Sequence, residues 1–271
     1  MTTAKPVALV TGASSGIGEA AASALVDAGF EVVGTSRNTS SVAPMNEVTF
    51  LDLDVTSDES VSMTVGRVLE RFGRLDVLVN NAGSGAAGAA EESSVAHDQG
   101  LFDINFFGLV RMMKAVLPHM RAAGSGRIIN ISSAVGLIPA PYMASYAATK
   151  HAIEGYSESV DHEVREHGIR VLLVEPGFTR TGFDTKAIQP DAPLPAYAVQ
   201  RRVFDDVMAR AMADGDDPAL VANVIVAAAT DQKPKLRYTA GSTAGRVSVL
   251  RRIAPPRAFD RQIRKLNRLP A

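Results

Sequence analysis

The sequence predicts an α/β fold, a doubly wound parallel sheet of about seven strands with helices on both faces. Short β-branched runs alternate with longer segments of helical periodicity along most of the 271 residues. Repeated strand–helix–strand order builds a parallel sheet through right-handed crossovers. The strand candidates are also continuously apolar, as in the Val-Leu-Leu-Val run at 171–174. Continuous apolar runs are typical of strands that are covered on both faces.

The elements can be placed in order along the chain. The expected strands span residues 7–10, 31–35, 48–53, 77–80, 127–131, 170–174 and 235–239. Helical periodicity covers residues 17–28, 59–72, 101–122, 145–167, 199–212 and 218–230. No linker, internal repeat or second core interrupts this pattern, so we expect a single domain over residues 1–271.

The alternation stops at about residues 179–217, where prolines and scattered charges surround one helical stretch. A long irregular insertion beyond the carboxyl end of a strand is either a mobile surface excursion or a substrate loop. We favour the substrate loop.

Composition excludes several classes of protein. No cysteine is present, so a disulfide framework, a thiolate nucleophile and a cysteine metal site are impossible. No cluster of metal-binding side chains indicates a metal either. A net charge of −1 argues against nucleic-acid binding. No apolar run approaches the roughly 20 residues that span a bilayer, and the first six residues are too short and polar for a signal peptide. We therefore expect a cytoplasmic protein.

Basic residues are concentrated in the C-terminal tail, at about residues 246–271. This pattern is either the solvated face of a terminal helix, which we favour, or a contact with a membrane surface or an anionic partner. Asp260 is the only acid among the basic residues, which are Arg246, Arg251, Arg252, Arg257, Arg261, Arg264, Lys265 and Arg268.

A glycine-rich turn follows the first strand. Residues 11–18 read Thr-Gly-Ala-Ser-Ser-Gly-Ile-Gly and lead directly into a helix. Gly12 permits the tight turn, Gly16 allows the backbone to approach a pyrophosphate, and Gly18 allows close packing of helix on strand. N–H groups at the helix start would then bind the phosphates of a dinucleotide. The other residues of this turn expected at the cofactor are Ser14, Ser15 and Ile17.

The end of the second strand indicates which dinucleotide is bound. An acidic residue there would hold the 2′-hydroxyl of the adenosine ribose of NAD. This chain has Ser36 and Arg37 instead, and an arginine suits a 2′-phosphate through charge-assisted hydrogen bonds. A merely solvated Arg37 is the alternative. The missing acid and the added cation agree, so we favour NADP(H) over NAD(H).

Tyr146 and Lys150 form a Tyr-x-x-x-Lys pair, and a separation of four places both side chains on one face of a helix. A lysine ammonium there can lower the pKa of a neighbouring phenol from its free value of about 10. Such a phenol can exchange a proton with a ketone or an alcohol near neutral pH. Ser132 and Ser133 lie just upstream, and alternation along a strand sends them to opposite faces, so only one can join the pair.

With this glycine spacing and this pair together, the chain resembles the short-chain dehydrogenases/reductases over nearly its whole length, less so after residue 182. The resemblance implies a Rossmann-like fold and reversible hydride transfer between a nicotinamide and a carbonyl or secondary alcohol. The usual family spacing selects Ser133, and the implied catalytic residues are Ser133, Tyr146, Lys150 and Asn105. The further cofactor residues that it implies are Asp54 and Val55, then Asn81, Ala82 and Gly83, then Pro176, Gly177, Thr179 and Thr181.

The resemblance also assigns roles to the four catalytic positions. Tyr146 exchanges the proton, and Lys150 lowers its pKa and holds the nicotinamide ribose. Ser133 binds the substrate oxygen, and Asn105 holds a water that links Lys150 to solvent. The helices at residues 101–122 and 145–167 look like those through which family members form homodimers or homotetramers.

Apolar and aromatic residues are expected around the reacting centre. They indicate a hydrophobic small-molecule ketone or alcohol, and ordinary loop packing is the alternative. The expected lining residues are Leu137, Tyr142, Met143, Phe178 and Phe183. Two other functions stay open: an NAD-preferring alcohol dehydrogenase, and a non-catalytic NADP-binding sensor that has kept the fold.

Overall fold

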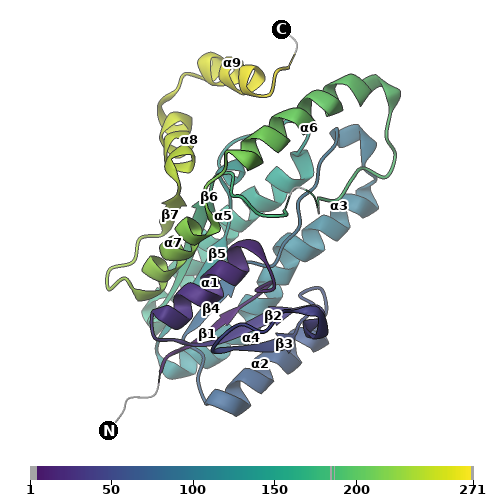
Figure 1. The fold of residues 1–271 in the computed structure, drawn as a ribbon. Coiled ribbons are helices and arrows are strands. Elements are labelled where there is room, and N and C mark those ends of the chain that lie inside the picture. Colours follow the sequence, from purple (N-terminus) through teal and green to yellow (C-terminus); the bar gives the residue numbers. More distant parts are fainter. Residues whose placement is uncertain (1–4, 184, 186, 270–271) are drawn as a thin grey trace.

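Seven parallel strands form one sheet in the order β3-β2-β1-β4-β5-β6-β7 (Figure 1). The computed structural model describes residues 5–183, 185 and 187–269, without the side chains of residues 248 and 252. The strand order reverses between β1 and β4, and ligands of doubly wound sheets bind at the carboxyl ends of the strands beside such a reversal. The strands are β1 (Val7–Val10), β2 (Glu31–Ser36), β3 (Val48–Asp52), β4 (Val77–Asn80), β5 (Gly126–Ile131), β6 (Ile169–Pro176) and β7 (Arg237–Ala240). The predicted fold class is confirmed.

Helices cover both faces of the sheet, and each face has its own apolar core. One face is covered by α1 (Gly16–Asp27) and α7 (Pro218–Thr230), and the other by α2 (Asp58–Phe72), α4 (Gly108–Ala123) and α5 (Ala144–Val164). Strand residues such as Leu9 and Val10 are buried because they alternate between the two cores. This double burial explains the continuous apolar runs in the strands.

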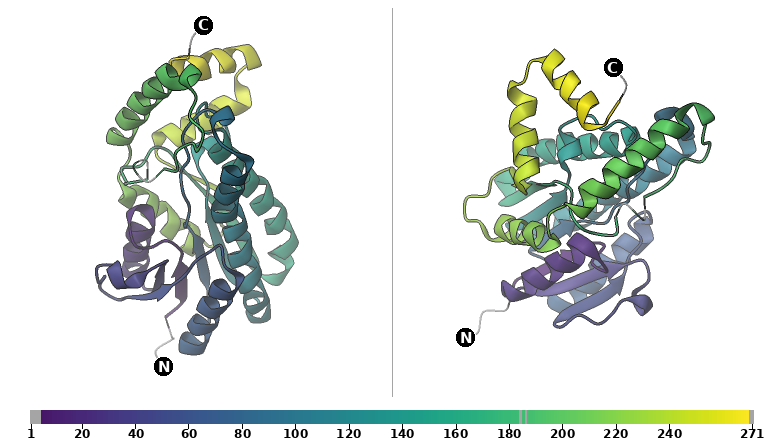
Figure 2. Two further views of the ribbon diagram at one scale, coloured as in Figure 1. Left: turned by 90° about the vertical axis from the view of Figure 1, so that its right-hand side faces the viewer. Right: turned by 45° about the horizontal axis from the view of Figure 1, so that its top comes forward.

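The remaining α-helices lie at the carboxyl end of the sheet or run toward that end (Figures 1 and 2). They are α3 (Val95–Phe102), α6 (Ala198–Ala213), α8 (Ser242–Ile253) and α9 (Pro256–Leu266). The predicted helix at residues 101–122 is wrong at its start. Helical structure begins at Val95 and passes through a π-helical turn, Asp103–Phe107, before α4. The tail forms two helices rather than one, because Pro255 has no N–H with which to continue α8 and Ala254 before it is extended. No helix among the described residues is long and apolar enough to cross a membrane.

The segment after β6 has the irregular course and the one long helix, α6, that its sequence predicts. An isolated bridge between Ile188 and Ala86 ties it to the segment after β4, and a second bridge, between Thr179 and Asp216, joins its own two ends. Its role as a substrate loop stays a prediction.

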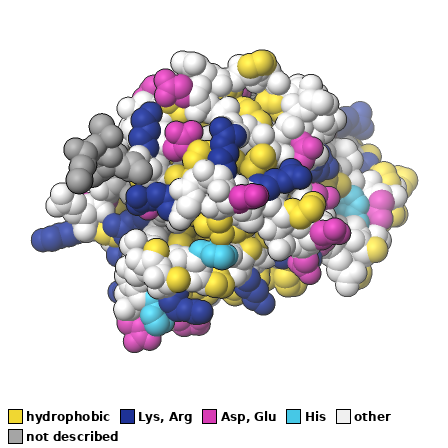
Figure 3. Space-filling model, turned by 90° about the horizontal axis from the view of Figure 1, so that it is seen from below, with side chains coloured by type: hydrophobic (Ala, Val, Ile, Leu, Met, Phe, Trp, Pro, Cys, Tyr) yellow, Lys and Arg dark blue, Asp and Glu magenta, His cyan; other side chains and the backbone are white. Residues whose placement is uncertain are grey.

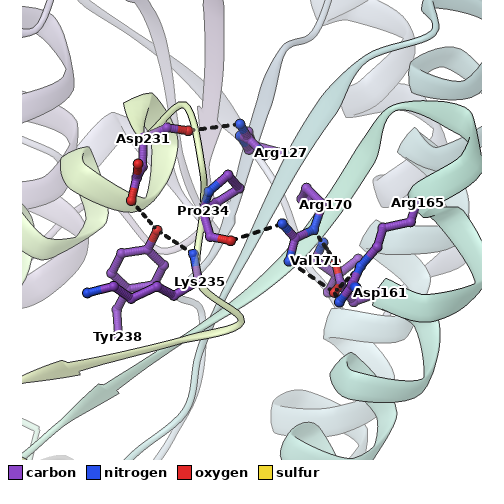
Figure 4. Close-up of polar contacts among 9 residues, drawn as sticks. All are labelled: Arg127, Asp161, Arg165, Arg170, Val171, Asp231, Pro234, Lys235 and Tyr238. Atoms are coloured by element: carbon purple, nitrogen blue, oxygen red, sulfur yellow. Dashed lines mark hydrogen bonds and ion pairs between the residues drawn. The ribbon is translucent and has the colours of Figure 1, made fainter.

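A buried carboxylate secures the sheet at the end opposite the expected site (Figure 4). Asp161 of α5 is fully buried and accepts hydrogen bonds from the Arg170 guanidinium (2.9 Å) and the Val171 backbone N–H (2.9 Å). It also pairs with Arg165 one turn later on the helix. Burial raises the pKa of the Asp161 carboxyl, but hydrogen bonds from the two arginines outweigh it and hold that pKa below its usual value.

Candidate active site

The glycine turn is shaped to admit another molecule close to its backbone. Gly12 and Gly16 both have left-handed backbones, with φ of 66° and 61°. A Cβ on Gly18 would lie 2.2 Å from the carbonyl oxygen of Gly12, so only glycine fits there. Ser15 caps α1 through its backbone alone, and its side chain makes no capping hydrogen bond. The first N–H groups of α1 therefore suit an anion such as a pyrophosphate, and the cradle fits the expected dinucleotide.

Thr11 and Asn81 hold this turn against the end of β4. The Thr11 hydroxyl accepts hydrogen bonds from the backbone N–H groups of Asn81 and Ala82, both at 3.0 Å. The Asn81 amide in turn donates to the carbonyl oxygens of Thr11 and Gly12, both at 3.0 Å. The side chain of Asn81 is thus occupied with the protein backbone, and its contribution to the site is to position the turn.

The predicted catalytic residues Ser133, Tyr146 and Lys150 come together beyond the carboxyl end of β5. A hydrogen bond joins the side chains of Ser133 and Tyr146. The Lys150 ammonium donates to the carbonyl oxygen of Ile131 (2.8 Å) and lies 5.6 Å from the centre of the Tyr146 ring. The other serine, Ser132, is buried and its hydroxyl points toward Gly136, away from this group. The geometry favours Ser133 over Ser132.

The proton affinities of the pair differ from the sequence-based expectation. Burial raises the pKa of the Tyr146 phenol strongly, and the hydrogen bond with Ser133 opposes this only in part. Burial also lowers the pKa of Lys150 from 10.5 to about 8. The expectation that Lys150 sets a lowered pKa for Tyr146 is therefore wrong for the protein alone, because desolvation dominates both groups.

Asn105 lies in the π-helical turn, and its side-chain amide is fully engaged. Its oxygen accepts from the Ser84 backbone N–H (2.8 Å), and its nitrogen donates to the Ser84 carbonyl (2.9 Å) and the Thr149 hydroxyl (3.2 Å). Thr149, buried between Tyr146 and Lys150 on α5, was not predicted, because a threonine in a helix gives no functional signal. Asn105 thus links the segment after Gly83 to α5, and its hydrogen bonds within the described part of the chain do not include Lys150.

The expected adenosine residues lie at the ends of β2 and β3. Arg37 is exposed, Ser36 is half-buried, and Arg37 is close enough to Asp54 to act on its charge. The Asp54 carboxylate accepts hydrogen bonds from the backbone and hydroxyl of Thr56, which hold its pKa below the usual range. Val55 packs closely against Gly108 at the start of α4. The Arg37 guanidinium is thus placed at the edge of the expected adenosine position.

The turn after β6 reaches the glycine turn. A Cβ on Gly16 would meet the Thr181 side chain at 3.1 Å, so Thr181 closes over the phosphate cradle. Thr179 is buried, and its hydroxyl donates to the Gly177 carbonyl (3.3 Å). Pro176 pairs in register with Ala240 of β7. Of the four predicted residues, Thr181 is thus the one that reaches the phosphate cradle.

The structure separates the predicted substrate residues into two groups. Met143 and Phe183 pack in one apolar cluster with Tyr146, and the Phe183 ring centre is 5.7 Å from that of Tyr146. Tyr142 instead packs on Phe204 of α6, with ring centres 5.8 Å apart, and its own backbone is left-handed (φ 64°). Leu137 is only half-buried and lies outside the cluster. Phe178 lies outside this cluster: 40% of it is exposed, and its carbonyl oxygen accepts a hydrogen bond from the Asp216 N–H.

A clasp, formed by residues 89–94 and 191–201, holds the expected substrate loop against the segment after β4. Glu92 is fully buried and accepts hydrogen bonds from the backbone N–H groups of Ala89 (3.0 Å) and Leu194 (2.7 Å). It also forms an ion pair with Arg201 of α6. Two more contacts complete the clasp, between Asp191 and Ser94 and between Tyr197 and Glu91. None of these residues was predicted, because every contact between the two halves of the clasp joins positions about a hundred residues apart.

Comparison with known proteins places this arrangement in context. A family model for short chain dehydrogenases matches residues 6–192. A 3-ketodihydrosphingosine reductase of Bacteroides thetaiotaomicron is 46% identical over 177 residues, which cover 65% of each chain. Retinol dehydrogenase 8 of Bos taurus is 35% identical over 267 residues, which cover 88% of this chain and 82% of the relative.

Solved structures agree with the fold and with dinucleotide binding. A short-chain dehydrogenase of Streptomyces avermitilis superposes with a TM-score of 0.83 at 37% identity and covers 98% of both chains. ElxO, solved with bound NADP, is 28% identical with a TM-score of 0.71, and it covers 87% of this chain and 97% of its own. A protein of Burkholderia phymatum solved with NAD is 25% identical with a TM-score of 0.79, covering 97% and 96%. Proteins solved with NADP and with NAD therefore share this fold.

Proposed function

Because the chain belongs to the short-chain dehydrogenase/reductase family, we propose that it uses NADP(H) to interconvert a hydrophobic ketone and its secondary alcohol. Membership of this family already makes the chain an NAD(P)-dependent dehydrogenase or reductase. The observation that carries the proposal is the Ser133–Tyr146–Lys150 group beyond β5, at the same end of the parallel sheet as a turn in which Gly18 leaves no room for a Cβ.

Each residue of the group has a role in this proposal. The bound nicotinamide supplies or accepts the hydride. Ser133 holds the substrate oxygen by a hydrogen bond, and Tyr146 gives that oxygen its proton in reduction or removes it in oxidation. Lys150 places a positive charge behind the phenol and opposes the rise in pKa that burial imposes on Tyr146. Asn105 acts through Ser84 and Thr149 by fixing the two segments that flank the group.

The choice of NADP(H) rests on the charge at the end of β2. Arg37 is exposed there and no carboxylate of β2 stands beside it to bind a ribose 2′-hydroxyl. A guanidinium binds a 2′-phosphate through paired, charge-assisted hydrogen bonds. The Arg37→Ala variant should lose catalytic efficiency with NADPH by at least about tenfold and change little with NADH. Equal losses with both cofactors would contradict this assignment, and Arg67→Ala on α2 is the control.

The hydrophobic substrate class rests on the cluster around Tyr146. Met143 and Phe183 place apolar atoms beside the phenol, so a bound substrate would lose water from its own apolar surface. The two relatives described above are named for sphingoid and retinoid substrates, which are lipids. These observations support a lipid-like ketone or alcohol.

The Tyr146→Phe variant tests the reaction directly. It removes only the phenolic proton donor, so turnover should fall by at least about a hundredfold while NADPH affinity is retained. Tyr156→Phe on the same helix is the matched control, because its ring packs on Phe106 away from the site. The measurement is NADPH absorbance across a panel of carbonyls and alcohols. Near-normal turnover by Tyr146→Phe would refute the assignment, and no turnover of any compound by the wild type despite tight NADPH binding would favour a sensor.

Assembly and location are part of the same proposal. We expect a cytoplasmic homodimer or homotetramer that forms through the outer faces of α4, with the turn before it, and of α5. Phe107 is 48% exposed there and stacks edge-on against Phe106, so an aromatic surface is available for a partner. Analytical ultracentrifugation of the wild type and of Phe107→Ser would test this.

A further inference from the structure

The C-terminal arm, α8 and α9 with their connecting turn, stands at the rim of the candidate active site (Figure 2). The first turn of α8 is fixed there, because Ala244 is fully buried and the Thr243 side chain lies 3.7 Å from where a Cβ on Gly177 would be. Its far end returns to α6, where the Gln200 amide donates to the carbonyl oxygens of Asn267 (3.4 Å) and Arg268 (3.2 Å). The arm therefore lies at the same end of the molecule as the expected substrate loop, of which α6 is part (Figure 1).

One side of α8 is apolar and faces solvent. Val249 is 58% exposed, Leu250 41% and Ile253 73%, and their spacing places them on one stripe of the helix. Arg246 lies one turn earlier on the same stripe and is also exposed. The apolar side chains of α9 differ, because Phe259 and Ile263 are buried and Leu266 alone among its large apolar residues is exposed. An exposed apolar stripe beside cations suits a partner that offers both an apolar surface and negative charge.

The charge of the arm is opposite to that of the rest of the molecule. Residues 246–271 hold eight basic residues and one acid, so the remaining chain carries a net charge of −8 within the overall −1. Arg246, Arg257 and Arg261 are exposed and take part in no ion pair among the described residues. The face at the other end of the molecule shows basic, acidic and apolar side chains intermingled (Figure 3). That face therefore lacks the excess of basic over acidic residues that the arm has.

We propose that the arm docks on an anionic membrane surface, with the α8 stripe in the interface and the arginines against lipid headgroups. The benefit of such docking rests on the proposed function, because a lipid-like ketone would then reach the active site directly from the membrane. A helix with an apolar stripe and basic flanks binds anionic bilayers in two ways at once: its apolar side chains are buried in the interface, and its cations are attracted to the anionic headgroups. A second copy of the chain fits less well, because pairing two arms would bring their arginines together.

Vesicle sedimentation tests the docking without any substrate. We expect the wild-type protein to sediment with vesicles of 30% phosphatidylglycerol in phosphatidylcholine and not with phosphatidylcholine alone, and to be released by about 0.5 M salt because surface charges are then screened. Arg246→Glu/Arg257→Glu/Arg261→Glu should weaken the partition by at least about a hundredfold. Val249→Ser/Ile253→Ser should weaken it about tenfold or more.

Matched controls separate the arm from general surface properties. Arg67→Glu/Lys114→Glu/Lys233→Glu makes the same change in net charge elsewhere, and Met63→Ser removes an exposed apolar side chain from α2. Both controls should sediment nearly as the wild type does. Loss of sedimentation in the controls to the same extent as in the arm variants would overturn the docking, as would a wild type that stays in the supernatant. A wild type that remains in the supernatant while Val249→Ser/Ile253→Ser changes its molecular mass would assign the stripe to a second copy.

Activity measurements distinguish this inference from the proposed function. With a water-soluble aryl ketone, the arm variants should match the wild type, because the arm is outside the catalytic group. With a long-chain ketone embedded in the anionic vesicles, their rate should fall at least about tenfold. Equal rates for all variants on the embedded ketone would refute the docking and leave the proposed reaction intact, while no turnover of either ketone by the wild type would refute the proposed reaction alone.

Discussion

The buried Lys150 lowers the free energy of unfolding, so replacing it by an uncharged residue should stabilise the protein. Burial lowers the pKa of Lys150 from 10.5 to about 8. Each pKa unit corresponds to about 1.4 kcal/mol, so keeping the lysine charged at pH 7 costs the folded state about 3 kcal/mol. Its hydrogen bond to the Ile131 carbonyl returns about 1 kcal/mol. Lys150→Met keeps a similar unbranched shape, so we expect the free energy of unfolding at pH 7 to rise by about 2 kcal/mol while turnover is lost.

The pH dependence identifies the cause of that stabilisation. Above pH 8 the folded wild type releases the Lys150 proton, whereas the unfolded chain keeps it to about pH 10.5. The unfolded state then binds more protons, so wild-type stability rises with pH relative to the variant. The advantage of Lys150→Met should therefore shrink to about zero by pH 10. Urea unfolding of both proteins from pH 7 to 10 measures this, with the exposed Lys114→Met as control. A less stable variant at pH 7, or an advantage that does not change with pH, would refute the reasoning.

Three further substitutions test other parts of the structure. Gly18→Ala should weaken NADPH binding at least about tenfold in a fluorescence titration, because its Cβ would lie 2.2 Å from a carbonyl oxygen, while Gly66→Ala on α2 meets nothing within 4 Å and should bind normally. Asp161→Asn should lower the free energy of unfolding by about 3 kcal/mol at pH 7, because two arginines lose their buried carboxylate. Since the folded pKa of Asp161 is lowered, this difference should persist down to about pH 4 and disappear only as the pH falls through the folded pKa. Glu92→Gln should raise KM for ketone several-fold with unchanged NADPH affinity and speed proteolysis of the loop, and unchanged KM and proteolysis would show that the clasp is dispensable.

Most of the sheet was predictable because the signals for parallel strands are local. Strands β1 and β4 match their predicted bounds, and the others differ by three residues or fewer at either end. The π-helical turn at Asp103–Phe107 was missed, because its sequence continues an ordinary helical pattern and the altered hydrogen bonding depends on packing against α5. The break in the tail was readable from Pro255 and Pro256, but the direction of α9 depends on contacts with α6.

The candidate site was predictable where a motif fixes the spacing and not where burial or distant contacts decide. Tyr146 and Lys150 lie on one helix, so their spacing places them together. The same spacing says nothing about solvent, and it is burial that sets both pKa values. Phe178 was expected in the substrate wall on residue type, and its backbone pairing with Asp216 is a contact between distant positions that the sequence does not show. The role of Asn81 in positioning the glycine turn likewise could not be predicted, because it depends on hydrogen bonds to Thr11 and Gly12, about seventy residues away.

The clasp has a consequence for how relatives of this protein diverge and for how they are redesigned. Its two halves, residues 89–94 and 191–201, meet through a carboxylate that no solvent reaches and that needs its arginine. If one half were replaced by the loop of another family member without the other half, either Glu92 or Arg201 would lose its ion-pair partner. The free energy of unfolding would then fall by several kcal/mol. The two segments should therefore behave as one exchangeable cassette: natural substitutions in one half should be accompanied by changes in the other, and chimeras should be built by moving both.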